Sequence, residues 1–119
     1  MTHPERVAEY LEHIADAIDR ARRYAEKVGS LTGLEQDELV QDAIVRTLAV
    51  IGEAVTQLQK VAPEFVAAHP KLPWSLMRGM RNKIIHDYLD VAWDVVWNTV
   101  QGDLPALRQQ IAELLKDLT

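Results

Sequence analysis

The chain has 119 residues, of which 48% are hydrophobic and 26% charged, the size and composition of one globular domain rather than a disordered segment. Its 13 basic and 18 acidic residues give a net charge of −5, which argues against nucleic-acid binding over the whole surface but leaves room for a small local site. There is no cysteine, so disulfides, thiolate catalysis and thiolate metal sites are excluded.

The absence of cysteine also suits a reducing cytoplasm, where we expect the protein to act. The segment Met1 to Tyr10 carries charges and has no apolar core, so it does not resemble a secretory signal. No apolar stretch approaches the roughly 18–20 residues that a membrane span requires. We therefore expect no membrane partner.

Proline and glycine fall in few places, and the segments between them have helical periodicity. A first helix is predicted from about Pro4 to Val28, ended by Gly29-Ser30 and followed by a loop through Thr32-Gly33. A second helix is predicted from Glu35 or Gln36 to Val61. Its apolar residues are too broadly spread for one stripe, so this helix either is central in a bundle or contacts a second chain.

The second half of the chain predicts two further helices. After one more helical turn from Glu64 to Ala68 and a rigid proline connector, a third helix is expected from Trp74 to about Tyr88. Asp90 is expected to cap a final helix from Val91 to Leu118, with a kink or new start at Asp103-Leu104-Pro105.

Consecutive helices with short connections predict an all-α fold, an antiparallel four-helix up-down bundle with a kinked last helix. No strand pattern, repeat or linker interrupts it, so residues 1–119 are expected to form a single domain. The surplus apolar surface of the second helix favours a twofold homodimer.

The octet Arg81-Asn82-Lys83-Ile84-Ile85-His86-Asp87-Tyr88 is the stretch with most chemistry. It closes a cationic run from Phe65 to His86 that holds four fixed positive charges and no Asp or Glu. The rest of the chain therefore sums to −9, which is −5 minus 4. A local positive field in an acidic protein favours an anionic ligand.

On one straight helix, Asn82 and His86 would share a face, so that the amide could hold one imidazole nitrogen and leave the other free. Arg81 and His86 would lie about 140° apart. Three explanations stay open: the helix ends or bends near His86, the long arginine reaches round, or a second subunit supplies the partner group.

Arginine binds phosphate through two hydrogen bonds and can stabilise a pentacoordinate phosphorane, and histidine moves protons near neutral pH. RNA carries its own nucleophile, the 2′-hydroxyl. An arginine with one or two histidines would therefore suffice to cleave RNA without a metal or cofactor, leaving a 2′,3′-cyclic phosphate. The histidines lack metal-ligand spacing, and we expect RNA rather than DNA as the partner.

Two other functions remain open. The cationic run could hold a nucleotide or RNA without catalysis, or the chain could be a helical adaptor that binds a protein through Trp93 and Trp97, which lie four residues apart on one face. Glu53, between two small residues of the second helix, is either a helix-flank carboxylate or a partner for an arginine of the run.

The octet matches the pattern R-x4-H-x-Y and resembles the HepT-like toxins of the HEPN superfamily. The flanks Pro73 to Met80, Val96-Trp97 and Asp103-Leu104-Pro105 resemble them too, as does Ile51-Gly52-Glu53-Ala54. The resemblance covers most of the chain from about Ala43 onward.

The resemblance implies a dimeric four-helix bundle in which two motifs face a shared cleft. It implies a metal-independent endoribonuclease, the toxin of a toxin–antitoxin pair, with tRNA as one candidate substrate. The partner would be a minimal nucleotidyltransferase antitoxin that adds AMP to Tyr88. By position, Arg81 and His86 are the catalytic pair. Asn82, Arg78 and Glu53 are supporting candidates that rest on the register and charge arguments.

Overall fold

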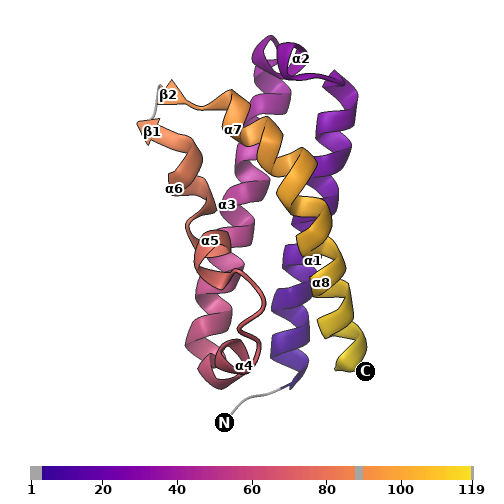
Figure 1. Ribbon diagram of the computed structural model, residues 1–119, viewed down its shortest axis with the longest axis vertical. Coiled ribbons are helices and arrows are strands. Elements are labelled where there is room, and N and C mark those ends of the chain that lie inside the picture. The colour runs from indigo at the N-terminus through magenta and orange to yellow at the C-terminus, as the bar shows by residue number, and fades with distance from the viewer. Residues whose placement is uncertain (1–3, 88–89, 119) are drawn as a thin grey trace.

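The computed structural model describes residues 4–87 and 90–118. Figure 1 shows a bundle in which the chain runs up, down, up and down again, with both ends of the chain at the base. The all-α fold class is confirmed. The elements in chain order are α1 (Pro4–Val28), α2 (Leu31–Glu35), α3 (Glu38–Val61), α4 (Pro63–Ala68), α5 (Trp74–Arg78), α6 (Met80–Ile84), β1 (Ile85–Asp87), β2 (Asp90–Val91), α7 (Trp93–Asn98), the π-helical segment η1 (Thr99–Asp103) and α8 (Leu104–Asp117).

The core forms between α1, α3 and α8, with α5 and α6 added on the side of α3 (Figure 1). Helix α1 begins and ends where the periodicity predicted, and its apolar residues recur at intervals of three and four on the buried face. Arg108 of α8 donates from Nε to Asp19 Oδ1 of α1 at 2.9 Å, which joins these two helices at the surface. In the described part of the chain, no helix is both long and apolar enough to cross a membrane.

The loop predicted after α1 is partly wrong, because Leu31–Glu35 form the short helix α2. Gly29 takes a φ of 73°, a conformation that ends α1 and that other residues rarely adopt. Ser30 then accepts a hydrogen bond from the Gly33 amide and caps α2, and Leu34 is fully buried. Asp37 caps α3 in the same manner, so this helix begins at Glu38, slightly later than predicted.

The prediction of one helix from Trp74 to Tyr88 is wrong. Gly79 separates α5 from α6, and α6 ends at Ile84. The chain then enters β1, which pairs antiparallel with β2 through Ile85 with Val91 and Asp87 with Asp90. Asp90 is therefore a strand residue and not a helix cap, and the next helix begins at Trp93 without a side-chain cap.

The break predicted near Asp103-Leu104-Pro105 is confirmed as the π-helical segment Thr99–Asp103. Pro105 lies in the first turn of α8 and has no amide hydrogen, so it cannot donate to the preceding turn. The wider π-helical turn accommodates this missing bond while Thr99 and Val100 stay buried.

The connector between α4 and α5 is anchored by an aromatic side chain. Trp74 is buried and donates from its indole nitrogen to the His69 carbonyl at 2.9 Å. The His69 ring in turn stacks near Phe65, and its Nδ1 lies 2.8 Å from the Phe65 carbonyl oxygen. These contacts fix where α5 starts.

Helices α3 and α5 approach each other closely at Gly52. A Cβ atom at this position would lie 2.9 Å from the Arg78 carbonyl oxygen and 3.4 Å from that of Met77. Because real Cβ atoms do not approach an oxygen so closely, only glycine fits while α5 stays where it is. The contact sets the position of α6, which follows α5 after a single residue.

We expect Gly52→Ala to lower the free energy of unfolding by about 1–3 kcal/mol, since the added methyl group must push α5 away from α3. Gly102→Ala is the matched control, because a Cβ atom there meets nothing within 4 Å. Urea unfolding followed by circular dichroism measures both. Equal stability of the two variants would show that the backbones do not need this close approach.

Candidate active site

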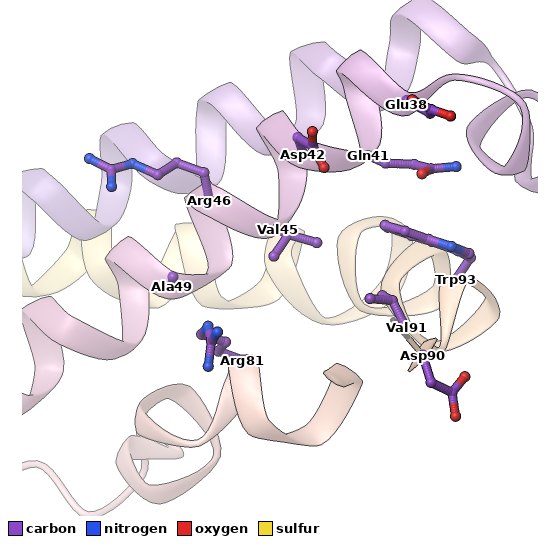
Figure 2. Close-up of a pocket in the computed structure, with 10 residues that line it drawn as sticks. All are labelled: Glu38, Gln41, Asp42, Val45, Arg46, Ala49, Arg81, Asp90, Val91 and Trp93. Carbon is purple, nitrogen blue, oxygen red and sulfur yellow. The ribbon is translucent and has the colours of Figure 1, made fainter. Parts of the chain in front are cut away.

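Arg81 faces a hollow between α3, α6, the β1–β2 hairpin and α7. Its volume is about 750 Å³, within the range of ligand-binding pockets. Figure 2 shows the lining residues, with the Arg81 side chain beneath Ala49 and with Trp93 and Val91 toward the other end of the hollow. The residues that line it are Glu38, Gln41, Asp42, Val45, Arg46, Ala49, Arg81, Asp90, Val91 and Trp93.

Arg46 is a site residue that the sequence analysis missed. It projects from α3, is exposed, and in Figure 2 extends along the helix away from Trp93. Arg46 lies seven residues before Glu53, so the two share one helix face. The position of Arg46 on the same helix face as Glu53 is the sequence signal that could have revealed this arginine.

The charges of this hollow are divided. Glu38, Asp42 and Asp90 are acidic and lie toward the Trp93 end, whereas Arg46 and Arg81 are the cations and lie at the other end (Figure 2). An anion entering from solvent would be attracted to the arginine end and repelled from the acidic end. Arg81 can bind a phosphate group through paired hydrogen bonds, and Arg46 adds a second positive charge to this end of the hollow.

A second hollow of about 440 Å³ continues from the first. The two share Arg46, Ala49 and Arg81, so they meet at the two arginines. Helix α1 forms the far wall of the second hollow through Tyr10 and His13. The arginines therefore lie in the middle of one groove that follows α3.

The backbone of His86 belongs to the hairpin that borders the first hollow. Ile85 pairs with Val91 and Asp87 pairs with Asp90, so His86 is an extra residue in β1 with no partner position in β2. Val91, the partner of Ile85, lines the hollow together with Arg81. The His86 side chain and the whole of Tyr88 lie outside the described residues, so their predicted roles stay predictions.

The helical register proposed for Asn82 and His86 is wrong, because α6 ends at Ile84 and the two residues belong to different elements. The same ending removes the 140° conflict between Arg81 and His86, as the first of the three explanations required. Asn82 is exposed on α6 and is not among the residues that line either hollow.

Arg78 and Glu53 have different surroundings. Arg78 donates from Nη1 to Gln59 Oε1 at 2.6 Å and lines neither hollow, which points to a role in holding α5 on α3. Glu53 lines the second hollow with Arg46 and Arg81, but its described hydrogen bond comes from Gln57 Nε2 at 2.9 Å rather than from an arginine.

Trp93 and Trp97 are half-buried and pack against the core, which favours a packing role for them over the protein-binding face considered from the sequence. Among residues 4–87 and 90–118, no three His, Asp or Glu side chains gather into a group that could hold a metal ion. The groove thus offers cations, aromatic rings and hydrogen-bonding groups, which are the means of holding a charged organic anion.

A family model described as "Ribonuclease HepT-like" matches residues 14–114. The chain belongs to the HepT-like family. The match includes all residues that line the first hollow, from Glu38 to Trp93, whereas Tyr10 and His13 of the second hollow precede it. No solved structure gives a significant match.

Two relatives illustrate the similarity. A protein of Caldanaerobacter subterraneus subsp. tengcongensis, named "Putative RNase TTE0752", is 36% identical over 107 residues, or 90% of this chain and 92% of the relative. A protein of Thermococcus cleftensis, named "Probable ribonuclease HepT", is 35% identical over 108 residues, or 91% and 94% of the two chains.

We expect Arg46→Ala and Arg81→Ala each to weaken binding of tripolyphosphate, an anion without a base, by roughly tenfold or more. Hydrogen bonds to charged groups contribute about 1.5–3 kcal/mol. Isothermal titration calorimetry at low salt measures the change. Arg23→Ala is the matched control, because this exposed arginine of α1 lies outside the groove. Unchanged binding in the Arg46 variant would remove this residue from the site.

Proposed function

We propose that this HepT-like chain is a ribonuclease and that the arginine end of the groove holds the phosphate to be cleaved. The observation that carries the proposal is the position of Arg81, which lines one hollow together with Val91 of the hairpin that contains His86. The relatives named as RNases support the same activity. We further propose that it cuts RNA internally and without a metal, with tRNA as one candidate.

The chemistry follows from the residue types. The 2′-hydroxyl of one ribose attacks the adjacent phosphorus while His86 accepts its proton. Arg81, assisted by Arg46, stabilises the extra negative charge of the phosphorane. The bond from phosphorus to the 5′-oxygen then breaks, and that oxygen receives a proton. The products are a 2′,3′-cyclic phosphate and a 5′-hydroxyl.

One imidazole cannot accept and deliver a proton at the same moment, so a second acid assists the leaving oxygen. A twofold homodimer that places two hairpins at one cleft would supply a second His86. An exposed apolar side chain supports such a pairing, since Leu39, which follows Glu38 at the start of α3, is 80% exposed. Sedimentation should give a dimer at micromolar concentration, and a monomer that still cuts RNA would contradict this part of the proposal.

We also propose that the protein is the toxin of a cytoplasmic toxin–antitoxin pair whose partner is a minimal nucleotidyltransferase. AMP on Tyr88 would bring a phosphate charge and bulk close to the catalytic histidine, which is two residues away. The added phosphate would compete with RNA for the arginines. The support is the family membership together with the presence of this tyrosine in the motif.

We expect His86→Ala and Arg81→Ala to lower the rate of RNA cleavage by about 10²–10⁴-fold, the range of general acid–base and charge-stabilising contributions. Arg81→Lys should also be slow, because an ammonium group cannot form the paired hydrogen bonds of a guanidinium. Gel analysis of a labelled RNA measures the rate, and Arg23→Ala is the control. If His86→Ala cuts as fast as the unchanged protein, the mechanism is wrong.

The proposed AMP modification of Tyr88 is tested by measuring the intact mass of the protein after co-expression with a minimal nucleotidyltransferase. We expect one or more AMP additions on the unchanged chain and none on Tyr88→Phe, which should still cut RNA because the hydroxyl is not needed for cleavage. Tyr10→Phe is the matched control and should still be modified. AMP found on Tyr88→Phe would place the modification elsewhere.

A further inference from the structure

The end of the groove formed by α1 has no part in the phosphate chemistry. Its hollow of about 440 Å³ is lined by Tyr10 and His13 of α1 and by Ala49, Val50 and Ala54 of α3. Glu53 and Gln57 of α3 line it too. It opens toward Arg46 and Arg81, which it shares with the first hollow. A ligand phosphate at the arginines would thus have an apolar, aromatic space directly beside it.

The two rings at this end are already arranged as a pair. The centroids of Tyr10 and His13 are 6.2 Å apart, and the ring planes meet at 88°. Tyr10 is half-buried and packs against the core, and Arg6 donates to its hydroxyl at 3.4 Å. His13 is exposed one turn further on. In an edge-to-face pair, the ring that contributes its edge keeps both of its faces outside the pair.

The polar groups beside the rings are ordered as well. Gln57 Nε2 donates to Glu53 Oε1 at 2.9 Å, which fixes an amide and a carboxylate next to each other on α3. Nucleobases are recognised in proteins by stacking on aromatic or imidazole rings and by hydrogen bonds to their edges. Both means are present here, and the cations that hold the backbone phosphate are adjacent.

We propose that the Tyr10–His13 hollow is a subsite for the base of a single-stranded RNA, the nucleotide next to the phosphate held by Arg46 and Arg81. The proposal rests on the ribonuclease function and adds to it where the strand runs: along α3 from the hairpin toward α1. It also defines the substrate as unpaired RNA, because a base can enter the hollow only when it has left a helical stack.

The test uses the full chain carrying His86→Ala, so that RNA stays intact, and measures binding of a labelled single-stranded RNA by fluorescence anisotropy. His13→Ala and Tyr10→Leu should each raise the Kd roughly tenfold, the scale of one lost base stack. Glu12→Ala, an exposed neighbour on α1 outside the hollow, is the matched control. Tripolyphosphate binding should be the same in all of these variants, since it has no base.

RNAs with a single abasic residue at each position in turn identify the base. One abasic position should weaken RNA binding to the protein with His13 intact by the same factor as His13→Ala weakens binding of the complete RNA. The abasic RNA should then bind the His13→Ala protein no more weakly than either change alone predicts. Because His13 is exposed, its truncation should leave the circular dichroism spectrum unchanged even if Tyr10→Leu unfolds.

Three results would overturn the proposal, and they differ from one another. If His13→Ala binds RNA as tightly as its parent while the wild-type chain cuts RNA, only the subsite is wrong. A wild-type chain that neither binds nor cuts RNA would remove the ribonuclease function and the subsite together. His13→Ala could also convert dimers to monomers while the remaining dimers bind RNA with unchanged affinity. That result would show that this hollow contacts a second copy of the chain instead.

Discussion

The close approach of α5 to α3 at Gly52 is the constraint on which the rest of the groove depends. With α5 held this near, the single residue Gly79 connects it to α6, and Arg81 of α6 lines a hollow together with residues of α3. Arg78 and Gln59 reinforce the contact from the surface. A larger residue at position 52 would separate the helices and move the cation away from Arg46, so a packing detail in the core determines the geometry of the candidate active site.

The hairpin after α6 solves a problem that a continuous helix would create. On a continuous helix, Arg81 and His86 would be five residues apart and would point in different directions. Because α6 ends at Ile84 and β1 inserts His86 as an extra residue opposite β2, the chain turns back and its return strand borders the hollow that contains Arg81. A bulge of this kind commonly occurs next to active sites, where it changes the direction of a side chain.

The sequence predicted the helical class, the bounds of α1, the turn at α4 and the interruption before Pro105, because each depends on local periodicity or on proline and glycine. The hairpin was not predicted, because strands of three and two residues are too short to show an alternating pattern. Their pairing is a contact between two separate segments, which local sequence patterns do not reveal. Arg81 was identified from its motif, and Arg46 could have been found on the helix face of Glu53. Tyr10 and His13 belong to the groove only through the packing of α1 against α3.

The most direct test of the account is cleavage of a DNA strand that contains one ribonucleotide, in the presence of EDTA. Attack by the 2′-hydroxyl without metal predicts a single cut after the ribonucleotide, with a 2′,3′-cyclic phosphate on the upstream product and a 5′-hydroxyl on the downstream one. Cutting at deoxynucleotides, or cutting of RNA that stops on chelation and returns with a divalent cation, would contradict it.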